Sequence, residues 1–506
     1  MKSIPSLCLA LLGGAALAHA ADRPNILFIA VDDLRPELGC YGKDYIQSPN
    51  IDRLASTGIV FERAYCQQAV CSPTRTSLMT GTRPDTTKVW DLVTHFRAAL
   101  PDVVTLQQNF KNHGYFVQGM GKIFHGGYDD PPSWSVPWFT PPSIKYALEK
   151  NRILDQRQFE GEPDDDTKTM PAKKAALDAA GKPTSKVNSR GPAFEGADVP
   201  DDTFQDGKVA DLAVSTLREL SRKPEPFFLA VGFIKPHLPF VAPKKYWDLY
   251  DESKISLAPN KFRPKDAPDY AIITSGELLN YYDIPAGSIP DGLARQLRHG
   301  YYAAVSYTDA QVGKVLAELD RLGLRQNTIV ILWGDHGWKL GEHDAWAKHS
   351  DCENDTNAPL ILSIPGMKHA GEHSSSLVEF VDVYPTLSEL AGLPLPPHLE
   401  GLSFKPLLDN PSRPWKQAAF SQYPRTASQT GSEAVMGYSM RTDRYRFTVW
   451  VARKDHTKIE AIELYDHQVD PQENTNIAKL PANAALVEKL MTQWRAGWKG
   501  ALPLDK

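Results

Sequence analysis

The chain has 506 residues, with 56 basic and 61 acidic side chains and a formal net charge of −5. This near balance excludes both the basic surface typical of nucleic-acid binding and the acidic tail of a solvating segment. Hydrophobic residues make up 42% of the chain, which is ordinary for a globular protein, while 40 prolines and 34 glycines predict many loops, where functional sites usually lie.

Residues 1–20 are predicted to form a secretory signal peptide. Lys2 precedes a short apolar run, Leu7–Leu17, and Ala18-His19-Ala20 has the small-x-small pattern of a cleavage site. The alternative, a buried N-terminal helix, is disfavoured because the run stops at a polar segment. No later stretch is long and apolar enough to span a bilayer. We therefore expect an exported protein, periplasmic or secreted, with no membrane span.

Apolar runs that alternate with helical patterns dominate the first four-fifths of the chain. Continuous apolar runs predict strands buried on both faces, as in the centre of a mostly parallel sheet. These runs cover residues 25–31, 226–233, 328–334 and 359–365, and the helical patterns cover residues 48–58, 103–114, 206–223 and 305–323. The alternation predicts an α/β fold in which a large, mostly parallel or mixed sheet is sandwiched by helices.

Changes in composition suggest the domain boundaries. Residues 21–412 are predicted to form the main domain, with residues 130–200, rich in proline and polar residues, as a loop-rich excursion over its surface; a flexible linker is the alternative. Residues 413–506 are predicted to form a smaller α+β subdomain. It would carry an antiparallel sheet, because residues 436–455 alternate, and end in an amphipathic helix.

Polar side chains follow three of the predicted strands at the point where each strand ends. Asp32-Asp33 follows the first, His237 lies just after the second, and Asp335-His336 follows the third. Sites in open α/β sheets form beyond the carboxyl ends of the strands, so these groups should share one edge. Crowded carboxylates favour a cation among them, and oxygen-rich ligation favours Ca²⁺ or Mg²⁺ over Zn²⁺. Taken singly, each pair could instead be a turn or a helix cap.

Cys71 stands at the start of a predicted helix, residues 72–81. Free amide groups at a helix N-terminus attract anions, and Arg75 returns to the same face one turn later. A buried, inert cysteine is the alternative. Without Cys8 of the signal peptide, four cysteines remain: Cys40, Cys66, Cys71 and Cys352. They are too few for a disulfide scaffold, their pairing is open, and at least one is unpaired if Cys71 is reserved for chemistry.

The stretch from Cys71 to Gly81 contains C-x-P-x-R and resembles the signature of formylglycine-dependent sulfatases, which belong to the alkaline phosphatase superfamily. In that family the cysteine is oxidised after translation to formylglycine (3-oxoalanine). Further segments, among them "VDDLRPELGCYG", "FFLAVGFIKPHLPF" and "DHGWKLGEHDAWAKHS", are similar to the iduronate-2-sulfatase type. The resemblance runs from about residue 24 to about residue 475, except in residues 130–200.

The resemblance implies one divalent cation, Ca²⁺ or alternatively Mg²⁺, and a set of roles for particular side chains. The metal ligands would be Asp32, Asp33, Asp335, His336 and the modified Cys71. The same resemblance makes Lys122 and His125 supports of the hydrated aldehyde, and gives the sulfate or the leaving oxygen to Arg75, His237 and Lys348. Histidine at position 336, where many sulfatases have asparagine, favours the iduronate type. Taken singly, His125, His237 and Lys348 could each be structural.

The implied reaction is hydrolysis of the 2-O-sulfate of a uronic acid at the end of a sulfated glycan. The partners would be the sulfated oligosaccharide and a maturation enzyme that converts Cys71, either formylglycine-generating or anaerobic. The resemblance implies a basic residue for the uronate carboxylate in the loop at residues 426–435, which is shorter here and contains no lysine or arginine. Arg425, next to it, is therefore the candidate, with His349 and Trp338 as further contacts. The alternatives are a phosphodiester or phosphonate hydrolase of the same superfamily, and an unmodified, non-catalytic protein that binds sulfated glycans.

Overall fold

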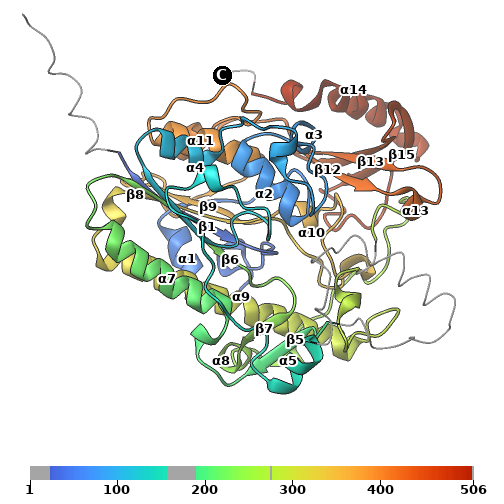
Figure 1. The fold of residues 1–506 in the computed structure, drawn as a ribbon. Helices are drawn as coiled ribbons and strands as arrows, with labels where there is room; N and C mark the ends of the chain where they lie inside the picture. The colour runs from blue at the N-terminus through green and yellow to red at the C-terminus, as the bar shows by residue number, and fades with distance from the viewer. Residues whose placement is uncertain (1–22, 157–189, 274–275, 504–506) are drawn as a thin grey trace, which may run out of the picture.

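The computed structural model describes residues 23–156, 190–273 and 276–503 (Figure 1). The predicted signal peptide lies outside these residues, and so does the greater part of the polar excursion, residues 157–189. Among the residues that are described, no helix has the length and apolar character needed to cross a bilayer.

A mixed sheet forms the centre of the main domain. Strands β8, β1, β6 and β4 run parallel to one another, whereas β9 is antiparallel to both of its neighbours, β8 and β2. Within the described part of the chain this sheet has seven strands, in the spatial order β10 (His373–Ser374), β2 (Ile59–Phe61), β9 (Leu360–Ser363), β8 (Thr328–Gly334), β1 (Asn25–Val31), β6 (Phe227–Phe233) and β4 (Phe116–Gly121).

Helices cover both faces of this sheet, as predicted, because every side chain of its central strands is buried. In β1, Ile26, Phe28 and Ala30 pack into one core, while the residues between them pack into the other. In Figure 1 one group of helices lies above the sheet and the other below it. The first group is α2 (Cys71–Thr80), α4 (Leu106–Asn112) and α11 (Val383–Leu390), and the second is α1 (Pro49–Ser56), α7 (Gln205–Leu220) and α9 (Asp291–Arg321).

The predicted elements differ from the observed ones in two informative places. The run at residues 359–365 becomes β9, but its direction is antiparallel; burial on both faces gives a continuous apolar run whichever way a strand points. The helix predicted from residue 305 begins at Asp291, directly after Pro290, because the earlier turns also place apolar side chains such as Ala294 and Leu297 in the core.

The C-terminal part forms a second, fully antiparallel sheet with a helix packed against it. The alternating segment at residues 436–455 supplies its central strands, as predicted, and the closing helix is α14. Among the described residues the elements are β12 (Ala418–Arg425), β13 (Val435–Thr442), β14 (Tyr445–Ala452), β15 (Asp455–Asp466) and α14 (Ala484–Gly500). This part lies beside the helices of the upper layer in Figure 1.

The described ends of the excursion pack onto the main domain. Trp134 lies against Gly119 of β4, where an added Cβ would be 2.6 Å from the indole, and Tyr146 is fully buried. At the C-terminal end of the excursion, strand β5 pairs in parallel with strand β7. The elements of this region are α5 (Glu149–Gln156), β5 (Phe194–Ala197), β7 (Phe240–Pro243) and α8 (Lys244–Trp247).

Candidate active site

The polar residues that follow β1, β8 and β6 meet at one edge of the sheet, as predicted. The amide of Asp32 donates to the carbonyl of Phe233 at the end of β6 (3.1 Å), and the amide of Asp335 donates to Val31 at the end of β1 (3.1 Å). The three strand ends are thereby tied together. Asp32, Asp33, Asp335 and His336 are all buried here.

Cys71 joins them from the other side, as the first residue of α2. Its Sγ lies 3.4 Å from Nε2 of His336 and 3.7 Å from Nζ of Lys122. Burial, and then the charge of Asp32, raise the pKa of the Cys71 thiol well above its usual value, although Lys122 and Lys348 oppose the shift. The unmodified side chain is therefore a neutral thiol rather than a reactive thiolate. We call Asp32, Asp33, Cys71, Asp335 and His336 the strand-end cluster.

Arg75 lies behind this cluster. Its Nε donates to Asp335 (2.8 Å), one Nη donates to Asp32 (3.1 Å), and the other donates to the carbonyls of Lys122 (2.5 Å) and Ile123 (3.1 Å). The side chain is completely buried. In this structure Arg75 fixes the two carboxylates; its predicted contact with the sulfate stays a prediction.

The strand-end cluster suits a divalent cation. Ligand atoms of Asp32, Cys71, Asp335 and His336 all lie within 4.8 Å of one another. Nδ1 of His336 lies 3.0 Å from the carbonyl of Gly337, so it carries the proton and leaves the lone pair of Nε2 directed at the cluster. Burial raises the pKa of Asp33 well above its usual value, and Asp32, Glu277 and Asp335 add to the shift although Lys348 opposes it. A cation would relieve this repulsion, so the cluster fits a site for a metal ion.

Basic side chains surround the cluster. Nζ of Lys122 lies 2.5 Å from Asp32, and Nζ of Lys348 lies 3.1 Å from both carboxylate oxygens of Asp33. Burial, and then the charge of Lys122, lower the pKa of His125 to about 3, so its imidazole is neutral. Nδ1 of His125 is buried and has no hydrogen-bond partner among the described residues.

A cavity of about 360 Å³ opens onto Cys71. Four of the predicted catalytic residues line it, Lys122, His125, His237 and Lys348, whereas Arg75 does not; their catalytic roles stay predictions. Its basic side chains, counted over the described residues, are Lys122, Lys145, Arg190, Lys235 and Lys348, and Asp206 is its one carboxylate. Asp206 already accepts the amides of Ile234 and Lys235. The walls therefore favour an anionic ligand.

The three predicted substrate contacts, Trp338, His349 and Arg425, do not line this cavity. Trp338 is buried in the core, with the Lys348 ammonium 4.9 Å from its ring centroid. His349 is buried and has a left-handed backbone, with φ 88°. The guanidinium of Arg425 donates to the carbonyls of Tyr270, Ala271, His349 and Pro424. A substrate contact by any of the three stays a prediction.

Glu277 is a member of the site that the sequence did not reveal. Its carboxylate is buried and accepts a hydrogen bond from Lys348 (2.9 Å). It is a lone acidic residue in "SGELLN", outside any motif and far along the chain from the strand ends. Only the folded chain brings it to the cluster.

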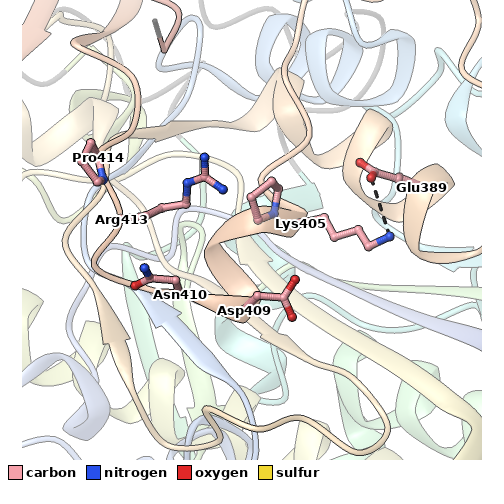
Figure 2. A pocket seen from close by; sticks show the side chains of 7 residues that line it. Glu389, Lys405, Asp409, Asn410, Arg413 and Pro414 are labelled. Atoms are coloured by element: carbon pink, nitrogen blue, oxygen red, sulfur yellow. Dashed lines mark ion pairs between the residues drawn. The ribbon is translucent and has the colours of Figure 1, made fainter. Parts of the chain in front are cut away.

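A larger cavity of about 540 Å³ lies elsewhere, around α12 (Lys405–Asp409). Figure 2 shows its lining, in which Lys405 pairs with Glu389 at 3.6 Å. Its charged residues balance, with Asp409 and Arg413 as the other pair of opposite sign, and none belongs to the strand-end cluster. Its size alone does not make it the site, because it has neither a nucleophile nor crowded carboxylates.

A second cluster of possible metal ligands, Glu353, His467 and Glu473, lies where the C-terminal sheet meets the main domain. We call it the boundary cluster. The guanidinium of Arg446 lies between its two glutamates and donates to Glu353 (2.6 Å) and Glu473 (2.5 Å). Arg441 also donates to Glu353 (3.2 Å). Its carboxylates are thus already neutralised by arginine, and no residue of it lines the cavity at Cys71.

Fold and site together define a class of enzyme. A family profile described as Sulfatase matches residues 24–393, which is more than half of the chain, so the chain belongs to the sulfatase family and is a sulfuric ester hydrolase. A profile described as N-sulphoglucosamine sulphohydrolase, C-terminal, matches residues 341–497.

Within that family the chain is similar to iduronate 2-sulfatase. The protein of Mus musculus is 37% identical over 557 aligned positions, covering 96% of this chain and 96% of the relative. The protein of Homo sapiens is 35% identical, with 96% and 97% covered. The fold is also that of a solved phosphonate monoester hydrolase from Silicibacter pomeroyi, with a TM-score of 0.72, 22% identity and 95% and 96% covered.

Proposed function

We propose that this sulfatase is exported and removes the 2-O-sulfate from a uronic acid at the end of a sulfated glycan, using a formylglycine made from Cys71. The observation that carries the proposal is the position of Cys71. It begins a helix, belongs to the strand-end cluster and lines a cavity with basic walls. A maturation enzyme of the host would convert Cys71, and the protein would act in the periplasm or outside the cell.

Asp32, Asp33, Asp335 and His336, with the modified residue 71, would hold one Ca²⁺ or Mg²⁺ ion. Such an ion withdraws charge from the sulfate oxygens and lowers the pKa of a bound hydroxyl. Arg75 keeps Asp32 and Asp335 in place through its fork of hydrogen bonds.

Basic side chains of the cavity wall would stabilise the charge that develops during the reaction. Charge develops on the sulfate and on the leaving oxygen as the S–O bond breaks, and preorganised donors stabilise it there. Lys122, His237 and Lys348 line the cavity next to Cys71 and supply such donors. Lys122, 3.7 Å from the sulfur, is placed to stabilise the attacking oxygen of the modified residue.

Two further cations on the cavity wall, Lys145 and Arg190, suit the carboxylate of a uronic acid. They take the place of the basic residue that residues 426–435 lack. Arg190 carries a planar fork of donors that matches a carboxylate. The identity to iduronate 2-sulfatases supports the same substrate class.

The test compares esters on protein whose peptide mass confirms formylglycine at position 71. Sulfate release from a 2-O-sulfated uronic acid disaccharide is expected, with a higher kcat/KM than hydrolysis of a phenylphosphonate monoester, and with complete loss in Cys71→Ala. A preference for the phosphonate ester would instead assign the chain the activity of its structural neighbour. Tight binding of the disaccharide without turnover would favour a glycan-binding protein.

A further inference from the structure

Glu277 lies next to three of the basic residues that line the cavity, two of them cations and the third a histidine, but it does not line the cavity itself. Its Oε2 accepts from Nζ of Lys348 (2.9 Å), and its Oε1 lies 3.2 Å from Nε2 of His237 and 3.9 Å from the guanidinium of Arg190. The carboxylate is fully buried. The buried Glu277 carboxylate thus lies next to the side chains that are proposed to face the leaving oxygen and next to Arg190, which is proposed to face the uronate.

The backbone around Glu277 is fixed by its neighbours. Leu278, the next residue, is completely buried in the core of the main domain. The amide of Arg190 donates to the carbonyl of Asn280 (2.8 Å), and the amide of Tyr282 donates to the carbonyl of Arg190 (3.1 Å). Glu277 and Arg190 therefore lie on two segments that are joined by backbone hydrogen bonds, so the fold fixes the distance between them.

His237 has an oxygen atom near each edge of its ring. Nδ1 lies 2.7 Å from the carbonyl of Leu238, and Nε2 faces Glu277. The hydrogen bond to Leu238 anchors one edge of the imidazole, and the Glu277 carboxylate lies against the other edge as a close contact without a hydrogen bond. Without the Glu277 carboxylate, Nε2 would keep only the longer contact with Asp33 (3.9 Å), and the ring could rotate away from the cavity.

Lys348 is held between two carboxylates. Both oxygens of Asp33 lie 3.1 Å from its ammonium, and Glu277 lies opposite at 2.9 Å. If Glu277 were absent, the ammonium would pair with Asp33 alone and would compete with a cation for that ligand. Burial raises the pKa of Glu277, but His237, Lys348 and Arg190 outweigh it and hold that pKa below its usual range.

We propose that Glu277 is a positioning residue, which aligns Lys348, His237 and Arg190 on the cavity wall for the sulfate ester and its acidic sugar. The identity of the ligand that these cations face rests on the proposed function. Glu277 itself contacts neither the strand-end cluster by hydrogen bond nor the cavity.

A role of Glu277 in aligning side chains and a purely electrostatic effect of its charge predict opposite changes in sulfate affinity for Glu277→Gln. A buried negative charge behind the cations of Lys348 and Arg190 weakens their attraction for an anion, so its removal alone should tighten the binding of inorganic sulfate. If Glu277 aligns Lys348 and Arg190, its loss should let these side chains adopt other conformations, and sulfate should bind more weakly. Loss of an outer-shell partner of this kind typically costs about 10- to 100-fold in activity.

The experiment compares wild type, Glu277→Gln and Glu277→Asp with a matched control, Glu473→Gln. Glu473 is also a buried carboxylate bound to a cation and a histidine, here Arg446 and His467, but it belongs to the boundary cluster. For each protein the formylglycine content, the kcat and KM for 4-nitrocatechol sulfate, the calorimetric affinity for inorganic sulfate and the thermal midpoint are measured.

Glu277→Gln is expected to lower kcat by about 10- to 100-fold with little change in KM, and to weaken sulfate binding. Glu277→Asp, which keeps the charge, should recover part of kcat. Glu473→Gln should lower the thermal midpoint and leave kcat unchanged. Unchanged kcat in Glu277→Gln, or tighter sulfate binding, overturns the proposal. If the wild type hydrolyses neither the aryl sulfate nor the disaccharide, the proposed function fails, and the sulfate affinities alone still decide the role of Glu277.

Discussion

The strand-end cluster and the boundary cluster contain the same kinds of side chain but differ in what occupies their centre. Each brings carboxylates and a histidine within reach of one another. In the boundary cluster Arg446 reaches both glutamates directly, and His467 lies 2.9 Å from Glu473. In the strand-end cluster the cations of Arg75, Lys122 and Lys348 contact the carboxylates from the periphery. The centre is faced by Cys71 and by Nε2 of His336.

The difference shows that residue type alone does not define a site. Buried ion pairs that are complete join parts of a fold, and breaking one is costly because the remaining charge is left unpaired. A cluster becomes a candidate active site when it meets a cavity, and only the strand-end cluster contributes to the cavity lining, through Cys71. The five predictions below test whether the two clusters really divide chemistry from structure in this way.

Cys71→Ala is expected to have the largest effect. If Cys71 is the precursor of the nucleophile, its loss should lower kcat/KM by at least ~10³-fold for any sulfate ester, without unfolding the protein. The measurement is sulfate release, together with the thermal midpoint. Cys66→Ala is the matched control, because Cys66 is another buried free cysteine that does not line the cavity. Equal loss in both variants would mean that the cysteines only support the fold.

Glu473→Gln is expected to be the most destabilising change that leaves the chemistry intact. It leaves His467 without its carboxylate partner and leaves Arg446 with Glu353 alone, so the unfolding free energy should fall by up to about 3–5 kcal/mol, the cost of breaking a buried pair. Denaturant unfolding measures this cost, and kcat per formylglycine should stay at the wild-type value. A fall in kcat with unchanged stability would show that the boundary cluster takes part in catalysis.

Asp33→Asn tests where a divalent cation binds. In the wild type, Ca²⁺ should raise the unfolding free energy, by about 2.7 kcal/mol at a hundred times its dissociation constant, and chelation should reverse this. Asp33→Asn should weaken that stabilisation and lower kcat by about 10- to 100-fold. Glu473→Gln should keep the full response to Ca²⁺. Loss of the response in Glu473→Gln alone would move the metal to the boundary cluster.

Asp351 lies in the segment that connects the two clusters, between Lys348 and Glu353. Neither of its buried oxygens has a hydrogen-bond partner among the described residues, and burial raises the pKa of this carboxyl to about 8. The folded state therefore holds a proton that the unfolded state loses near pH 4, so stability is full below pH 4 and falls as pH rises to about 8.

We expect this loss to be on the order of 5 kcal/mol and to be absent in Asp351→Asn. Unfolding free energies of both proteins between pH 4 and pH 9 provide the measurement. Parallel curves for the wild type and the variant would show that Asp351 does not cause the slope.

Arg190→Gln should have the smallest effect, and one that depends on the substrate. Losing a hydrogen bond to a charged group costs about 1.5–3 kcal/mol, so KM for the uronic acid disaccharide should rise at least about tenfold. KM for an aryl sulfate without a carboxylate should change little. Arg425→Gln is the control, since its guanidinium serves main-chain carbonyls and should affect stability instead. A larger KM effect in Arg425→Gln would restore Arg425 as the carboxylate contact.

Much of the fold and the centre of the site could be predicted from the sequence. Strand β1 coincides with the predicted run at residues 25–31, because a strand buried on both faces is a continuous apolar segment. Asp32, Asp335 and His237 could be assigned to one edge since parallel strands end together. Cys71 could be placed at the start of α2, because Pro73 favours the first turn and Gly81 ends the helix with a left-handed backbone.

What escaped prediction depends on contacts between distant residues. Glu277 carries no motif, and Lys145 and Arg190 lie in or beside the excursion whose sequence shows little periodicity. The direction of β9 follows from its pairing with β8 and β2, which composition does not encode. The position of Arg425 next to a short loop predicts a substrate contact, whereas the fold directs its guanidinium to carbonyl oxygens.

The measurement that bears most directly on the account is activity as a function of Cys71 conversion. The protein is prepared with different amounts of maturation enzyme, and the formylglycine fraction is determined by peptide mass. Sulfate release from the 2-O-sulfated uronic acid disaccharide should rise in proportion to that fraction and extrapolate to zero at zero conversion. Activity that is independent of the fraction, or absent at full conversion, would contradict the assignment of Cys71 as the centre of the site.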